Sequence, residues 1–368
     1  MHPNKVKKYF YFVICAVVVS YMSGLFLYIL EEDYSKDFKY PFDVDINLLV
    51  NQLRQKEVPD VAPINTYNYD YIYSCSQKCK LEDPLYTQGI RLVYLIKSAP
   101  HNNNKRLAIR NSWGFERRFS DVEIKTVFLL GITSNEILQR KIKEESSTFN
   151  DIIQANYIDS YFNNTVKTMM GFKWAITYCN ESKFYMFVDD DYYVSTKNVL
   201  RFVRNPANYP QYLKEYLQTL PKVKLPFIRR KRQNINFELP EDVKLYAGYV
   251  IVSKPQRFIT SKWYVSLEEY PYNKWPPYVT AGAYVLSREA LLQMYYASFY
   301  TKHFRFDDIY LALVAKKVDI EPFHCDEFHF YRKKYEPKEY QYTIASHGFN
   351  NPEELLQIWT NQKSLGNA

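Results

Sequence analysis

The sequence predicts an α/β protein built on a parallel, doubly wound sheet. Apolar residues make up 47% of the 368 positions and charged residues 24%, which is enough to bury a sizeable core. Between residues 90 and 204, short apolar and aromatic segments alternate four times with amphipathic segments. Repeated strand–helix alternation with short connections favours right-handed crossovers, and therefore a parallel sheet with helices on both faces.

The individual elements follow from this alternation in chain order. Apolar and β-branched runs predict the strands, and Ser134 and Glu136 supply a cap and an acidic first turn for the second helix. The expected strands are 90–96, 124–130, 151–157 and 184–188, and the expected helices are 104–113, 134–149, 164–178 and 196–204.

After residue 204 the alternation stops. Residues 205–243 contain prolines and many basic residues, and they predict an insertion or excursion loop. The remaining expected elements are strands 243–252, 283–286 and 340–344, helices 288–298, 308–317 and 352–362, and an aromatic, Pro-rich loop at 270–278.

Residues 9–30 carry no charge over 22 positions. A helix of that length spans about 33 Å, close to the ~30 Å hydrocarbon core of a bilayer. Lysines precede it and acidic residues follow, so the positive-inside rule predicts a cytosolic tail at 1–8 and a non-cytosolic location beyond residue 30. A cleaved signal peptide is the alternative, but its apolar core is usually about 7–15 residues, so an uncleaved signal anchor is favoured. The polar segment 31–85 is then predicted to be a stem, and residues 86–368 are predicted to form the folded domain.

Two sequons, at Asn163 and Asn180, fit glycosylation in a lumenal or extracellular compartment. Four cysteines beyond the apolar segment allow two disulfides in three connectivities. A metal knuckle would need a second closely spaced pair, so a disulfide role is favoured. These cysteines are Cys75, Cys79, Cys179 and Cys325.

The nine glycines are so scattered that no two lie closer than 17 positions. The sequence therefore excludes a glycine-rich dinucleotide fingerprint and a glycine-rich phosphate loop. The net charge is +8, and the densest basic run is 222–232. We interpret that run first as a solvated loop and second as a site for an anionic partner. No nucleic-acid partner is expected.

Asp189, Asp190 and Asp191 directly follow the apolar strand 184–188. They are therefore expected at the carboxyl edge of the sheet, where doubly wound folds bind their ligands. Adjacent carboxylates repel one another unless a cation lies between them, and Mg²⁺ or Mn²⁺ takes such oxygens. In an extended segment residues i and i+2 share a face, so Asp189 and Asp191 are expected to share one ion. The alternative is an acidic triplet in a solvated turn.

A second carboxylate pair, Asp307 and Asp308, opens an expected helix. Aspartate is common as an N-cap or first-turn residue, but one ionised carboxylate can also act as a general base. The helix N-terminus is expected to keep it ionised. His347 lies in a strand–loop–helix turn, and is either a solvated loop histidine or, with Asp191, part of a mixed oxygen and nitrogen site for Mn²⁺.

Basic residues gather on the first helix after the first strand. Arg106 and Arg110 are four residues apart and share a face, and Lys105 lies beside them. Such a face can meet a diphosphate at the sheet edge, or it can be an ordinary basic helix surface.

Taken in order, these motifs resemble the β-1,3-glycosyltransferases of glycosyltransferase family 31, which transfer galactose, N-acetylglucosamine or N-acetylgalactosamine from UDP-sugars. The matching stretches lie between about residue 90 and residue 360. They include RLAIRNSWG at 106–114, VFLLG at 127–131, DSYFNNTVK at 159–167, DDD at 189–191, LYAG at 245–248, the aromatic segment 270–287, DDIY at 307–310, and His347 before ELLQIW at 354–359.

The resemblance implies a GT-A fold, in which a single catalytic domain is built on a Rossmann-type sheet. It also implies a UDP-sugar donor, and Mn²⁺ or another divalent cation. It implies that Asp191 is the principal metal carboxylate, with Asp189 in support and His347 as the distant ligand, and that Asp308 is the catalytic base. The implied donor-binding residues are Arg106, Arg110, Asp159, Lys167 and Asp190. The implied acceptor and sugar pocket contains Trp275, Tyr278, Gly282 and Asp307. Asn163 matches the glycosylated Asn of the family.

The implied reaction is an inverting transfer, with galactose favoured, to the 3-hydroxyl of a glycan acceptor on a glycoprotein or glycolipid. The implied setting is a single-pass type II Golgi membrane protein with a lumenal catalytic domain, and homo- or hetero-oligomerisation is left open. The usual acidic motif E-D-V-Y-x-G reads here as Asp307 to Ala312, and the segment 280–283 has fewer glycines than usual.

Two alternatives remain beside this interpretation. A catalytically silent relative could bind glycans or a partner enzyme, but both carboxylate sites and His347 are present. A metal-dependent phosphotransfer enzyme could use the aspartate triplet, but the chain has no phosphate loop, and this reading leaves the apolar segment 9–30 unexplained.

Overall fold

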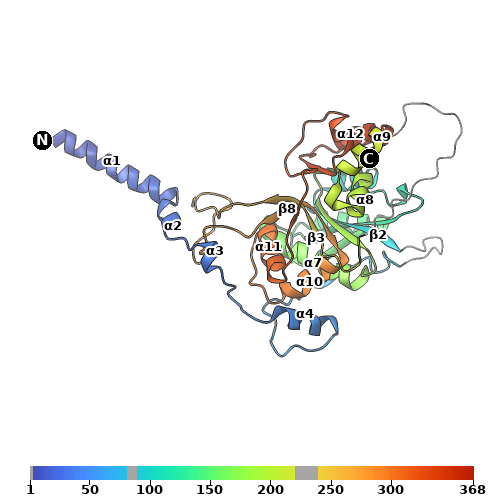
Figure 1. The fold of residues 1–368 in the computed structure, drawn as a ribbon. Coiled ribbons are helices and arrows are strands. Elements are labelled where there is room, and N and C mark those ends of the chain that lie inside the picture. The colour runs from blue at the N-terminus through green and yellow to red at the C-terminus, as the bar shows by residue number, and fades with distance from the viewer. Residues whose placement is uncertain (1–2, 81–88, 220–238) are drawn as a thin grey trace. The chain divides into compact units, whose positions relative to one another are not determined.

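A computed structural model of the chain describes residues 3–80, 89–219 and 239–368 (Figure 1). The chain forms two compact units. The first contains Met1–Val44 and Ile251–Tyr278, and the second contains Asp45–Val250 and Val279–Ala368. The second unit carries the predicted α/β fold and is described first.

The main sheet is mixed but rich in parallel strands, as predicted. Its order is β1-β4-β3-β2-β5-β8-β7-β9. The four central strands, β4, β3, β2 and β5, are parallel to one another. Strand β1 runs antiparallel to β4, and β8 runs antiparallel to β5. The strands are β1 (Tyr71–Tyr73), β2 (Ile90–Lys97), β3 (Glu123–Ile132), β4 (Ile152–Ile158), β5 (Phe184–Asp189), β7 (Tyr246–Ile251), β8 (Tyr278–Ser287) and β9 (Phe323–His324).

The strand order reverses between β2 and β5, so right-handed crossovers place α5 and α6 on one face and α7 on the other. Helices α7, α10 and α11 contact one another, and Figure 1 shows them grouped together. The helices are α5 (Asn103–Arg110), α6 (Glu136–Phe149), α7 (Asn164–Tyr178), α8 (Thr196–Arg204), α10 (Arg288–Ser298), α11 (Asp307–Lys317) and α12 (Pro352–Ser364).

Strand β2 is at the centre of the core. Its residues 92–96 are completely buried, because both faces of the sheet are covered by helices. This explains why the sequence of β2 is a nearly continuous apolar run rather than an alternating one. The strand ends at Lys97, whose position is important for the site.

A small second sheet has the order β10-β11-β6. It contains β6 (Tyr192–Val194), β10 (Phe328–His329) and β11 (Ala345–His347). The expected strand 340–344 is not formed, because η4 (Glu339–Gln341) is a short 3₁₀ turn and pairing with β6 begins only at residue 345. The register pairs His347 with Tyr192, which brings the histidine beside the aspartate triplet.

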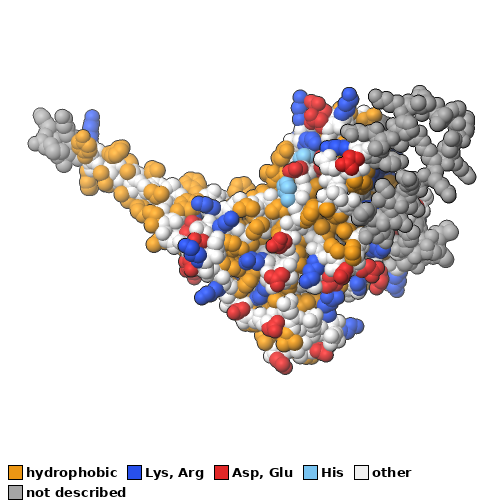
Figure 2. Space-filling view, viewed as in Figure 1, with side chains coloured by type: hydrophobic (Ala, Val, Ile, Leu, Met, Phe, Trp, Pro, Cys, Tyr) orange, Lys and Arg blue, Asp and Glu red, His pale blue; other side chains and the backbone are white. Residues whose placement is uncertain are grey.

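In the first unit, the apolar N-terminal segment forms two helices. Helix α1 (Pro3–Met22) ends before Gly24, whose φ of 75° lies in the left-handed region, and α2 (Leu25–Ile29) follows. The expected continuous helix over 9–30 is therefore interrupted. Within the described ranges, no helix meets both the length and the apolarity that crossing a bilayer requires. Figure 2 shows hydrophobic side chains along α1.

The segment expected to be a stem contains ordered elements. Helix α3 (Tyr34–Asp37) belongs to the first unit, whereas α4 (Ile46–Arg54) contacts α10 and buries Ile46, Leu49 and Val50. Strand β1 then joins the edge of the main sheet. The sheet-bearing unit therefore begins at Asp45, inside the segment that was expected to be a stem.

The expected loop 205–243 contains η3 (Pro206–Asn208) and the helix α9 (Gln211–Thr219). The basic run 222–232 lies outside the described residues.

One disulfide forms, between Cys79 and Cys179. Cys75 and Cys325 remain thiols, so the second expected disulfide is absent from the described structure. Cys75 follows β1 at one edge of the sheet and Cys325 follows β9 at the other. Seven strand spacings separate these edges, about 34 Å, which no disulfide can bridge.

Candidate active site

The carboxyl ends of β2 and β5 meet where the strand order of the sheet reverses. Lys97 and Asp189 are register partners at this point, each the last residue of its strand. Doubly wound sheets bind their ligands at such a switch point. Several of the predicted site residues, among them Asp190 and Asp307, lie close to this position.

Lys97 joins two of the acidic groups. Its ammonium lies 3.0 Å from Asp189 Oδ1 and 2.9 Å from Asp307 Oδ2, and it also donates to Ala281 O at 2.9 Å. Burial opposes the charge of Lys97, but Asp189 and Asp307 outweigh this effect and raise its pKa. Desolvation raises the pKa of Asp189 to about 6, even though Lys97 acts in the opposite direction. Lys97 therefore links the aspartate triplet to the second carboxylate pair.

Asp190 points toward the β2–α5 connection. Its carboxylate accepts hydrogen bonds from Ser98 Oγ at 2.6 Å and Asn102 Nδ2 at 2.9 Å, and Lys105 Nζ lies 3.4 Å away. These contacts make Asp190 a fixed part of the framework around the site.

Asp191 lies beside His347. The distance from His347 Nε2 to Asp191 Oδ2 is 3.3 Å. Burial opposes the charge of Asp191, but the contact with His347 lowers the pKa of this carboxyl, and the same contact raises the pKa of His347. The second oxygen, Oδ1, is buried and has no hydrogen-bond partner.

The metal set expected from sequence is only partly assembled. Asp191 and His347 come together, but the strand ends at Asp189 and the chain turns at Asp190 and Asp191, so the expected i, i+2 alternation does not continue. Asp189 pairs with Lys97 instead. Among residues 3–80, 89–219 and 239–368, no group of three or more His, Cys, Asp or Glu side chains is arranged to hold a metal ion.

The two residues that do meet nevertheless fit a divalent cation. An orphaned buried carboxylate oxygen beside an imidazole nitrogen is a mixed donor set that Mn²⁺ accepts. Around them, the carboxylates at 189–191 and 307–308 outnumber the nearby cationic groups Lys97 and Lys105. This excess of negative charge favours a bound cation.

Asp307 and Asp308 begin α11, as expected. Asp307 is buried and accepts from Thr168 Oγ1 at 3.0 Å in addition to Lys97. Asp308 accepts the backbone N–H of Ile309 at 2.8 Å. Desolvation, followed by the charge of Asp307, raises the pKa of Asp308 to about 7, so the helix N-terminus does not dominate its ionisation. A carboxyl with such a pKa can accept a proton near neutral pH.

Arg106 and Arg110 share a face, as their spacing predicts, but both guanidinium groups pair with carboxylates, and of Arg110 only Nη1 has no hydrogen-bond partner. Arg106 is fully buried and makes a two-pronged ion pair with Glu145 at 2.8 and 2.6 Å. Arg110 pairs with Glu145 and with Asp151, each at 2.8 Å. The hydrogen bonds from Arg106 lower the pKa of Glu145 to about 2, although burial acts in the opposite direction.

Arg106 still reaches the site through a hydroxyl. It donates to Ser98 Oγ at 3.0 Å, and Ser98 donates to Asp190. The structure therefore gives Arg106 a supporting contact with the triplet rather than an open anion-binding surface.

Asp159, which follows β4, and Lys167, in the first turn of α7, form an ion pair whose side chains are less than 10% exposed. Lys167 Nζ is 3.0 Å from both carboxylate oxygens and donates to Ser98 O at 2.7 Å. Asp159 Oδ2 also accepts the N–H of Gly131 at 2.7 Å. Both residues thus stabilise the loops beside the site.

Gly282 lies on β8 where two sheets approach. A Cβ atom at this position would lie 2.1 Å from Tyr192 Oη, so only glycine fits. The Tyr192 ring in turn packs against His347, with ring centroids 5.1 Å apart.

Trp275 and Tyr278 belong to the first unit, so their place in an acceptor pocket remains a prediction.

The two sequon asparagines lie at helix ends. Asn163 Nδ2 donates to Ile158 O at 2.8 Å, and Asn180 follows α7. Glycosylation of either residue remains a prediction.

Two participants were not predicted from sequence. For Lys97 the sequence pattern contains only a weak indication of a role in the site, since the residue ends an apolar strand next to one that ends in Asp189. For Glu145 the pattern contains no such indication, because the residue is one of two consecutive glutamates on a charged helix.

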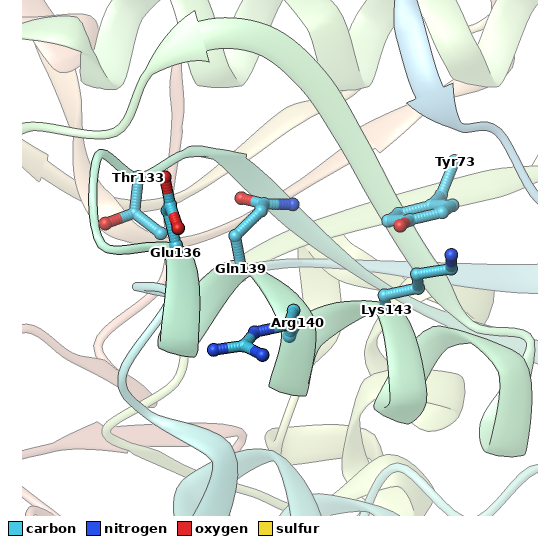
Figure 3. Close-up of a pocket in the computed structure, with 6 residues that line it drawn as sticks. All are labelled: Tyr73, Thr133, Glu136, Gln139, Arg140 and Lys143. Carbon is cyan, nitrogen blue, oxygen red and sulfur yellow. The ribbon is translucent and has the colours of Figure 1, made fainter.

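A pocket of about 450 Å³ lies elsewhere on the second unit, between α6 and β1. Figure 3 shows its lining, with Arg140 and Lys143 on the helix and Tyr73 opposite them. None of the predicted site residues lines this pocket. The candidate site is therefore built on the carboxylate cluster and not on the pocket.

Comparison with known proteins identifies the chain's family. The galactosyltransferase family model matches residues 104–326. The chain is 41% identical to beta-1,3-galactosyltransferase brn of Drosophila melanogaster over 94% of this chain and 92% of that protein. It is 30% identical to beta-1,3-galactosyltransferase 1 of Homo sapiens over 82% of this chain and 81% of that protein.

A solved structure of galactosyltransferase LgtC covers 75% of this chain and all of its own, with 9% identity and a TM-score of 0.35, which is too low to assign a fold. The family match and the sequence relatives are sufficient by themselves. The chain therefore belongs to the galactosyltransferase family, and it is a glycosyltransferase of the β-1,3-galactosyltransferase type.

Proposed function

We propose that the protein transfers galactose from UDP-galactose to the 3-hydroxyl of a glycan acceptor on a glycoprotein or glycolipid, forming a β-1,3 linkage. The single observation that carries this proposal is the arrangement at the switch point of the sheet. There Lys97 links the aspartate triplet to the carboxylate pair that begins α11. The names of the relatives support galactose as the sugar. A GT-A fold is part of the same proposal.

Asp308 is the proposed catalytic base. Its carboxylate takes the proton of the acceptor 3-hydroxyl, and the oxygen attacks the anomeric carbon from the side opposite UDP. The new C–O bond forms as the bond to the UDP oxygen breaks, so one displacement inverts the configuration. The raised pKa of Asp308 supports this role, since a base near neutrality is matched to its task.

Asp191 and His347 are the proposed ligands of a divalent cation such as Mn²⁺. When bound, such a cation neutralises the negative charge of a diphosphate leaving group. The residues of this chain prepare that site: His347 keeps Asp191 ionised, and Tyr192 packs against the imidazole.

We also propose that the protein is a type II Golgi membrane protein with a lumenal catalytic domain. The uncharged segment 9–30, the lysines before it and the sequons at Asn163 and Asn180 support this location. Treating the cellular protein with a glycosidase that removes N-linked glycans should increase its gel mobility. Unchanged mobility would count against a lumenal location.

The activity test measures UDP release by the full-length chain with Mn²⁺ and a panel of UDP-sugars, with and without β-glycoside acceptors. We expect acceptor-dependent release with UDP-galactose. Asp308→Asn should lower transfer by about 10²- to 10⁴-fold while UDP-galactose still binds, because the amide cannot accept the proton.

Asp326→Asn is the matched control, since its carboxylate is 88% exposed. It should transfer galactose at the wild-type rate. Normal turnover by Asp308→Asn would refute the base assignment. Sugar binding without transfer by the wild-type protein would favour a silent family relative.

A further inference from the structure

Two segments that are distant in sequence pack together in the first unit. One is the acidic segment that follows α2, and the other is the excursion 251–278 between β7 and β8. The excursion contains Trp275 and Tyr278, which the resemblance to family 31 implies for the acceptor and sugar pocket. The contacts that stabilise the conformation of the excursion should therefore affect acceptor binding.

Arg257 organises this excursion from inside. Its side chain is completely buried. Nη1 donates to Val265 O at 2.9 Å and Ser266 O at 3.0 Å, and Nη2 donates to Tyr270 O at 2.8 Å and Tyr272 O at 3.1 Å. One guanidinium thus fixes four backbone carbonyls, which a lysine with its single nitrogen cannot match.

Glu31 balances the charge of Arg257. Its Oε1 accepts from Arg257 Nε at 2.7 Å, and only 4% of the glutamate side chain is exposed. A buried charge that loses its partner is strongly unfavourable, so removing Glu31 would loosen the contacts of Arg257 as well. The excursion therefore depends on a residue more than 200 positions earlier in the chain.

Backbone contacts extend this junction toward Trp275. Glu32 N donates to Pro271 O at 3.0 Å, and Asn273 N donates to Glu32 O at 2.9 Å. Next to them the Tyr270 ring packs on Trp275, with ring centroids 4.1 Å apart. The acidic segment thus pairs with residues 271 and 273, which lie between Tyr270 and Trp275 in the sequence.

We propose that Glu31 is a positioning residue that, through Arg257, holds the excursion in the conformation that binds the acceptor. This inference rests on the proposed function, because it takes the excursion to be the acceptor-binding segment. Glu31 then has a role in shaping the excursion, so the segment that contains it is more than a spacer.

The test compares the full-length wild-type chain with Glu31→Ala, using Mn²⁺, UDP-galactose and a β-glycoside acceptor. We expect the acceptor KM to rise about 10- to 100-fold, because a displaced binding segment misplaces its ligand. The KM for UDP-galactose and the slow hydrolysis of UDP-galactose without acceptor should stay unchanged. A purely structural defect would instead lower kcat in both reactions and leave the acceptor KM unaltered.

Glu32→Gln is the matched control. Its side chain is exposed, and the variant removes the same charge while keeping the backbone bonds to Pro271 and Asn273. It should retain the wild-type acceptor KM, whereas Arg257→Lys should reproduce the defect of Glu31→Ala. A wild-type acceptor KM in Glu31→Ala would overturn the inference.

A second measurement is independent of the proposed activity. Lys262 and Lys274 are exposed on the excursion, and limited digestion with trypsin should cut after them faster in Glu31→Ala than in the wild type. Equal cutting rates would refute the structural role of Glu31. If the wild type transfers no sugar but cutting is accelerated, the proposed function fails and the positioning of the excursion stands.

Discussion

At the scale of single residues, the ionisation of Asp308 sets the expected pH dependence. Its pKa is raised to about 7, so the carboxyl is largely protonated below neutrality and cannot act as a base there. We expect kcat/KM for transfer to rise with pH and to level off above about pH 7. Asp326→Asn should follow the same profile. A rate that is flat between pH 5.5 and 8 would contradict the role of Asp308.

The raised pKa of Asp308 also predicts an effect on the stability of the folded protein. A carboxyl whose folded pKa lies above its unfolded value favours folding while it is protonated, and this contribution is lost as the pH rises through about 7. Asp308→Asn should therefore raise the unfolding temperature relative to the wild type above pH 7. On this prediction, the ionised carboxyl of Asp308 lowers the stability of the fold above pH 7.

Lys97 is the second residue whose charge can be tested. Its side chain is 4% exposed and lies between two carboxylates. Lys97→Met leaves these carboxylates without their cation, so we expect the free energy of unfolding at pH 7.5 to fall by about 3–5 kcal/mol in chemical denaturation. The loss in the free energy of unfolding should be smaller below pH 6. The pKa of Asp189 is about 6, so this carboxyl becomes neutral there and no longer needs a cation.

Lys105→Met provides the comparison for Lys97. Lys105 is 17% exposed and lies 3.4 Å from Asp190, so its loss should cost less than about 1 kcal/mol. Equal losses for the two variants would show that Lys97 is not the buried link between the carboxylate groups.

At the scale of elements, Gly282 marks the close approach of β8 and β6. The added Cβ in Gly282→Ala would lie 2.1 Å from Tyr192 Oη and 2.7 Å from Tyr192 Cζ. We expect a loss of about 1–3 kcal/mol in the free energy of unfolding, because the strands must shift to admit the methyl group. Tyr192→Phe removes the nearest atom and should restore part of this loss. If Tyr192→Phe restores none of it, the strain lies elsewhere.

The elements themselves were largely predictable because the periodicity of a sheet strand is local. The four central strands were found from apolar runs, and the aspartate triplet was placed at the sheet edge because it directly follows one of them. The strand at β11 was misplaced, since its pairing with β6 depends on residues about 150 positions away. Local sequence carries no information about such a partner.

The site was less predictable than the fold for the same reason. Asp307 and Lys97 are 210 positions apart, and a single lysine at the end of a strand forms no motif. The pairing of Asp189 with Lys97 was not predicted either, and the chain turns at Asp190 where an extended segment was expected. Motifs indicated which residues matter, but tertiary contacts decide how they are paired.

At the scale of the whole molecule, one disulfide constrains the sheet-bearing unit. Cys79 and Cys179 are 100 positions apart, so the bond ties the segment after β1 to the end of α7. Closing so long a loop restricts the unfolded chain, and we expect the double variant Cys79→Ser with Cys179→Ser to lose roughly 2–4 kcal/mol in the free energy of unfolding. Cys75→Ser is the control, because Cys75 is a free thiol that donates to Ile152 O. If reductant destabilised the double variant as much as the wild type, the stabilising bond would have to involve another pair.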